Sequence, residues 1–131
     1  MKNAILSIVL MVFITSCATK AKFPISGITP GAEITAKMKK DKNNNFRIFI
    51  EANYLASAER LSPPKKTYII WILTKDNSIK NIGQLKSKSS KKSTFETLSS
   101  FKPVEIFITA ENEGDLSIPS GTEISRTFFK R

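Results

Sequence analysis

Apolar and polar side chains alternate along most of this chain from residue 32 onward, and a period of two restricts it to β structure. In residues 32–40, charged side chains and Thr alternate with apolar ones, which are Ile34, Ala36 and Met38. Successive side chains of a strand point to opposite faces, so this segment is predicted to be a half-buried strand. Residues 41–45 predict a turn because Asn tolerates left-handed backbone angles. Residues 46–51 repeat the alternation and complete a predicted hairpin.

Residues 68–73 are apolar at every position, which predicts the most buried strand of the fold. The connection before it, residues 56–67, contains Pro63-Pro64 and is predicted to carry the chain from one sheet to the other. Further strands are expected at residues 79–86, 95–98, 104–110 and 122–129, with loops at 87–94 and 111–121. Seven short strands around a single Trp71 predict an all-β fold, a seven-stranded immunoglobulin-like antiparallel β-sandwich over residues 31–131.

The N-terminus has the layout of a secretory signal. Lys2 supplies the basic start and residues 4–14 an apolar run, which is too short to span a bilayer. The run ends in Ile14-Thr15-Ser16-Cys17, which resembles the lipobox of bacterial lipoproteins. Residues 1–16 are therefore predicted to be a cleaved signal peptide, and Cys17 is predicted to be the lipidated first residue of the mature chain.

That resemblance implies a location in the bacterial cell envelope, held to a membrane through the lipid on Cys17. Two or more acyl chains give stable membrane anchoring. Ala18 follows the cysteine in place of the Asp that retains enterobacterial lipoproteins at the inner membrane, so the outer membrane is favoured. Residues 17–30 contain several Pro and Gly and show little periodicity, and we expect them to form a lipidated tether.

The mature chain is strongly basic. Without Lys2 it has 20 basic residues against 11 acidic ones, a net charge of +9. The basic residues form three clusters, which are Lys37, Lys39, Lys40 and Lys42; Lys65 and Lys66; and Lys86, Lys88, Lys91 and Lys92. Lys on exposed strands prevents edge-to-edge pairing, and an alternative role is contact with anionic lipid or lipopolysaccharide.

Nucleic acid is not expected as a partner, because stacking platforms need aromatic side chains interleaved with the charges. Most aromatic residues fall on predicted core positions. Phe49, Phe107 and Phe129 lie out of phase with the inward positions of their strands. They are expected to form an exposed apolar patch, to be covered by loops, or to lie on strands whose inward phase is assigned wrongly here.

The composition excludes several kinds of catalytic site. The chain has no His, and its one Cys is the predicted lipidation residue, which excludes Ser-His-Asp and Cys-His catalysis and the usual zinc ligands. Glu51 and Glu105 are expected on wet strand faces as partners of Lys. Glu111, Glu113 and Asp115 form the one acidic cluster, a weak candidate for a Ca²⁺ site that is otherwise a polar turn. We expect no enzyme activity and no cofactor.

Three motifs carry a family resemblance. Tyr68-x-x-Trp71, Ile82-Gly83-Gln84-Leu85, and Ile108-Thr109-Ala110-Glu111 followed by Pro119 are similar to the extracytoplasmic C-terminal domain of anti-sigma-K factors. The resemblance covers about half of the mature chain and implies a sandwich fold. It does not imply sigma-factor binding, which in that family resides in a separate cytoplasmic domain.

The expected function is that of a non-catalytic envelope lipoprotein whose β-sandwich binds another envelope protein or has a structural role. The alternative is a ligand-binding module that recognises anionic glycolipid or glycan through its Lys-rich faces.

Overall fold

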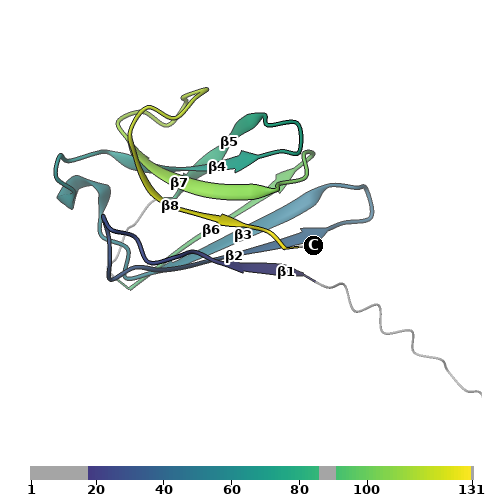
Figure 1. The fold of residues 1–131 in the computed structure, drawn as a ribbon, viewed down its shortest axis with the longest axis horizontal. Coiled ribbons are helices and arrows are strands. Elements are labelled where there is room, and N and C mark those ends of the chain that lie inside the picture. Colours follow the sequence, from purple (N-terminus) through teal and green to yellow (C-terminus); the bar gives the residue numbers. More distant parts are fainter. Residues whose placement is uncertain (1–17, 86–90, 131) are drawn as a thin grey trace, which may run out of the picture.

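Two antiparallel four-stranded sheets lie face to face (Figure 1). The computed structural model describes residues 18–85 and 91–130. The first sheet has the order β1 (Thr19–Lys22), β2 (Glu33–Lys40), β3 (Phe46–Asn53) and β6 (Lys92–Ser99). The second has the order β5 (Ile79–Leu85), β4 (Thr67–Leu73), β7 (Glu105–Glu111) and β8 (Thr122–Phe128). The predicted all-β sandwich is confirmed, with eight strands instead of seven.

The connectivity is that of an immunoglobulin-like sandwich. Strands β2, β3 and β6 take the places of strands A, B and E, and β5, β4, β7 and β8 those of C′, C, F and G. As predicted, residues 56–67 carry the chain between the sheets. This connection contains a 3₁₀ turn, η1 (Ala58–Arg60).

The β2–β3 hairpin forms as the alternation predicts. Met38 lies opposite Ile48 and Ala36 opposite Ile50, so the apolar positions of both strands share one face. In the turn, Asn44 has a φ of 62°. The Asp41 carboxylate accepts hydrogen bonds from the Asn43 and Asn45 backbone N–H groups at 2.8 and 2.9 Å.

The prediction of a tether over residues 17–30 is wrong for the described residues. Residues 19–22 form β1, an edge strand that pairs with β2, and the Phe23 N–H continues the pairing by donating to the Ile34 carbonyl at 3.0 Å. Ala21 and Phe23 point into the core and are buried. Because the strand is only four residues long and precedes Pro24 and Gly27, its alternation is too short to be detected from sequence.

Strand β6 begins three residues earlier than predicted. Its inward positions include Ser93, Thr97 and Ser99, so the apolar signal of a strand is missing although the pairing with β3 covers its whole length. Of the predicted loop over residues 87–94, residues 87–90 lie outside the described part of the chain.

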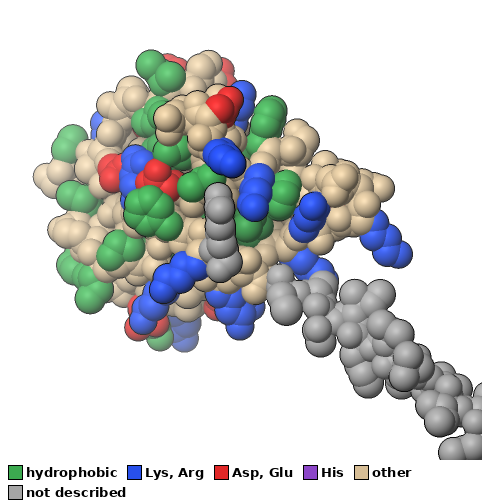
Figure 2. Space-filling view, turned by 45° about the vertical axis from the view of Figure 1, so that its right-hand side comes forward, with side chains coloured by type: hydrophobic (Ala, Val, Ile, Leu, Met, Phe, Trp, Pro, Cys, Tyr) green, Lys and Arg blue, Asp and Glu red, His purple; other side chains and the backbone are tan. Residues whose placement is uncertain are grey.

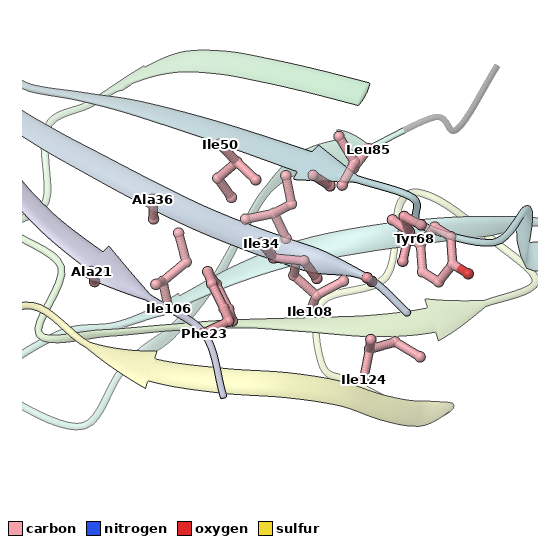
Figure 3. Packing of buried hydrophobic residues seen from close by; sticks show 14 of the residues in the cluster. Ala21, Phe23, Ile34, Ala36, Ile50, Tyr68, Leu85, Ile106, Ile108 and Ile124 are labelled. Carbon is pink, nitrogen blue, oxygen red and sulfur yellow. The ribbon is translucent and has the colours of Figure 1, made fainter. Parts of the chain in front are cut away.

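The main core fills the space between the sheets (Figure 3). Both sheets supply isoleucines to it, among them Ile34, Ile50, Ile106 and Ile108, and all four are buried. Tyr68 of β4 lies in the same core and donates its hydroxyl hydrogen to the Ala56 carbonyl. Burial raises the pKa of the Tyr68 hydroxyl to about 12, so this hydroxyl stays a donor at neutral pH.

Trp71 does not lie between the sheets. It forms a second cluster with Ile69 and Phe107 on the outer face of the second sheet, and its ring stacks on Phe107 with 6.2 Å between centroids. Leu116 of the β7–β8 loop packs against this cluster. Strand β4, which contains Trp71, is therefore buried on both faces as predicted, because the β7–β8 loop covers its outer face.

Candidate functional site at the two ends of the sandwich

The sandwich has two different ends. The Thr19 end, at the right of Figure 1, comprises the start of β1, the β2–β3 and β4–β5 turns, the β6–β7 connection and the residues after β8. The loop end, opposite to it, comprises the β1–β2, β3–β4 and β7–β8 connections. Candidate functional residues gather at both ends.

The Thr19 end contains an open hollow of about 620 Å³ between the two sheets. Three exposed lysines line it, Lys75 from the β4–β5 turn, Lys102 from the β6–β7 connection and Lys130 after β8. The other lining residues are Thr19, Met38, Pro103, Val104 and Phe129. We call this site the lysine hollow; it combines a cationic rim with an apolar wall.

The two carboxylates that lie in the turns of the Thr19 end accept hydrogen bonds within those turns. Asp41 accepts the two backbone hydrogen bonds of the β2–β3 turn. Asp76 accepts hydrogen bonds from the Thr74 hydroxyl and the Ser78 N–H, and these bonds hold the pKa of Asp76 below its ordinary value. Among residues 18–85 and 91–130, no ion pair involves Lys75, Lys102 or Lys130.

The predicted lysine clusters are dispersed over the molecule. Lys39, Lys40 and Lys42 lie at the Thr19 end, whereas Lys65 and Lys66 lie just before β4 at the loop end. Lys92 pairs with Glu51 at 3.0 Å. Lys86 and Lys88 lie outside the described residues.

Like charges face each other across the outer surface of the first sheet. Lys20 of β1 lies opposite Lys37 of β2, and Lys39 lies opposite Arg47 of β3. Directly opposed like charges destabilise a sheet. Arg47 compensates through an ion pair with Glu96 at 2.8 Å, so the uncompensated positive charge is concentrated on β1 and β2.

The weak candidate for a Ca²⁺ site at Glu111, Glu113 and Asp115 is not assembled in the structure. Glu111 turns inward, is 1% exposed, and its carboxylate accepts hydrogen bonds from the Thr109 hydroxyl at 2.7 Å and from the N–H and hydroxyl of Ser120 at 3.1 and 2.9 Å. Glu113 and Asp115 remain exposed. Within the described part of the chain, no three carboxylate, His or Cys groups come close enough to hold a metal ion.

The remaining candidate carboxylates are ion-pair partners. Glu51 pairs with Lys92, and Glu105 pairs with Arg126 at 3.3 Å. Arg126 also lies over the Phe107 ring at 4.0 Å. Glu51 is therefore a partner of Lys as expected, whereas Glu105 pairs with an Arg and its side chain is 14% exposed.

The three out-of-phase phenylalanines do not form an exposed patch. Phe107 is buried in the outer cluster that Leu116 of the β7–β8 loop covers, which confirms cover by a loop. Phe129 is buried in the main core, so its predicted phase is wrong, and Phe49 is half-buried. The exposed large apolar side chains lie elsewhere, at both ends. Those at the loop end are Ile25, Ile28, Tyr54 and Ile118, and those at the Thr19 end are Ile79, Leu98, Phe101, Val104 and Phe128.

The lysine hollow was not predicted from sequence. Lys75, Lys102 and Lys130 are far apart along the chain, in the β4–β5 turn, the β6–β7 connection and the segment after β8. Each of these lysines follows a strand that ends at the Thr19 end of the sandwich. That relation becomes visible only when the strand topology is known.

Cys17, the predicted lipidation residue, lies outside the described residues, one residue before the first of them. In the part of the chain that the structure describes, no helix is long and apolar enough to cross a membrane. Comparison with protein-family models, curated proteins and solved structures found no match to this chain. The resemblance to anti-sigma-K factors therefore stays a prediction.

Proposed function

We propose that this protein is a bacterial envelope lipoprotein, anchored through Cys17, whose β-sandwich is a non-catalytic module that presents its loop end to another envelope protein. The observation that carries the proposal is the opposition of the two ends. The fold begins at Thr19, two residues after Cys17, and exposed apolar side chains lie on loops at the other end.

The loop end has the character of an interaction surface. Ile25 is 82% exposed, Tyr54 62% and Ile118 70%, and the three residues come from three different connections. Large exposed apolar side chains that gather on one part of a monomer commonly mark protein interaction sites. In immunoglobulin-like domains, loops at one end of the sandwich are the usual binding elements.

The short link between Cys17 and Thr19 determines which way the loop end faces. Two residues span at most about 7 Å, so a lipid on Cys17 would hold the Thr19 end against the bilayer and leave the loop end facing away from it. The resemblance of residues 68–121 to an extracytoplasmic domain also supports an envelope location.

Site-specific crosslinking in cells tests this proposal. A photoreactive phenylalanine analogue in place of Ile118 is expected to give one discrete protein adduct. The matched control places the analogue at Thr35, which is exposed in the middle of β2, and is expected to give none. No adduct at Ile118, or equal adducts at both positions, would contradict a binding role for the loop end.

A further inference from the structure

We propose that the lysine hollow binds the phosphate head groups of anionic phospholipids, so that the Thr19 end docks on the bilayer surface. The location of the bilayer rests on the proposed anchoring at Cys17. The binding chemistry rests on the hollow alone.

The first argument is position. Thr19 is both the first residue of β1 and part of the lining of the hollow. Since at most about 7 Å of chain separates it from Cys17, a membrane that holds Cys17 lies within reach of the hollow. The chain between Cys17 and Thr19 is too short to hold the hollow away from that membrane.

The second argument is charge complementarity. Lys75, Lys102 and Lys130 line one hollow from the β4–β5 turn, the β6–β7 connection and the segment after β8, without a carboxylate partner in the described residues. The neighbouring Asp41 and Asp76 are already occupied by hydrogen bonds within their turns. Three ammonium groups around one opening provide charge-assisted donors for a phosphate group.

The third argument is the apolar surface around these lysines. Val104 and Phe129 line the hollow, and Phe101 and Phe128, 49% and 61% exposed, lie at the same end. The Lys80 ammonium stands 4.7 Å from the centre of the Phe101 ring. Figure 2, which turns this end forward, shows Lys and Arg side chains with hydrophobic ones beside them. Such a mixture suits the boundary between head groups and acyl chains.

The energetic contribution is large enough to measure. Each Lys near an anionic membrane surface strengthens binding by about fivefold, so three together contribute about 100-fold. A lipid anchor and a basic surface acting together would fix the orientation of the sandwich as well as its location.

The test uses residues 18–131 without the lipid, because all core residues of the described structure lie between Ala21 and Phe129. Binding is measured by co-sedimentation with vesicles of phosphatidylcholine alone and of phosphatidylcholine with phosphatidylglycerol in equal parts. The test variant carries Lys75→Gln, Lys102→Gln and Lys130→Gln. The control carries Lys65→Gln, Lys66→Gln and Lys91→Gln, which removes the same charge away from the hollow.

We expect the chain to bind only the anionic vesicles, the test variant to lose about 100-fold in affinity, and the control to lose less than about fivefold. Equal losses in both variants would show that net charge alone drives binding and would overturn the proposal, as would the absence of binding. Binding of inorganic phosphate without vesicle binding would assign the hollow to a soluble anion and also overturn it. Failure here leaves anchoring at Cys17 untouched, because the tested chain lacks that residue.

Discussion

Glu111 shows how a side chain that looks like a metal ligand in sequence acts as a structural group in the fold. Its carboxylate closes the β7–β8 loop through Ser120, and through the Thr109 hydroxyl it continues to the Trp71 indole N–H, which donates to Thr109 at 2.8 Å. The close approach of residue 121 to the backbone of β7 also explains why this position is a glycine. A Cβ at that position would lie 1.9 Å from the Ala110 carbonyl oxygen, which no side chain can tolerate.

Replacing Glu111 with Gln tests this network. Burial works to raise the pKa of Glu111, but hydrogen bonds from Thr109, Gly121 and Ser120 outweigh it and hold the pKa below its ordinary value of 4.5. A carboxyl with a lowered pKa stabilises the fold above its unfolded pKa, and that contribution is lost as the pH falls through the folded value. We expect Glu111→Gln to lower the free energy of unfolding at pH 7 by about 1–3 kcal/mol.

The measurement is urea unfolding at about pH 7 and about pH 3. The stability difference between the wild type and Glu111→Gln should shrink at the lower pH, because the carboxyl of the unfolded chain is then protonated and the contribution of the lowered folded-state pKa is being lost. The exposed Glu113→Gln serves as control and should change stability by less than about 0.5 kcal/mol at pH 7. An unchanged difference at both pH values would contradict a charged Glu111.

At the scale of elements, the strands with a strict apolar alternation were predictable and those without it were not. Residues 32–51 gave the β2–β3 hairpin and residues 68–73 gave β4, because their inward side chains are apolar without exception. Strand β1 was not predicted because Ala21 is the one apolar residue on its inward face before Phe23. Strand β6 was predicted too short because Ser93 begins its inward face.

The same reasoning explains why the sites were predicted only in part. Carboxylates near each other in sequence suggested a metal site at Glu111, Glu113 and Asp115, yet the loop turns the first inward and the other two outward. The lysine hollow depends on which strand ends meet in space. The spacing of residues along the chain does not show which strand ends meet.

The Phe23→Ala variant distinguishes a folded N-terminal segment from a tether. Phe23 is 4% exposed and packs in the main core, so its truncation should lower the free energy of unfolding by about 3 kcal/mol. Ile25→Ala, two residues away at an 82% exposed position, should change it by less than about 0.5 kcal/mol. Denaturant unfolding measures both; equal small effects would contradict the docking of this segment.

At the scale of the whole molecule, the sandwich is polarised along its long axis. The two ends lie at opposite sides of the ribbon in Figure 1. One end carries the start of the fold, the lysine hollow and exposed apolar side chains beside it, and the other carries exposed apolar side chains on loops. With Cys17 lipidated, the net charge of +9 on the mature chain would lie close to anionic lipid. The proposed orientation of the sandwich at the membrane depends on that one modification.

Mass spectrometry of the protein purified from its native membrane tests this dependence most directly. We predict a mature polypeptide that begins at Cys17 and carries a diacylglyceryl group on the sulfur, and no such species from a Cys17→Ser variant. An unmodified polypeptide, or one that begins at any other residue, would contradict the anchoring.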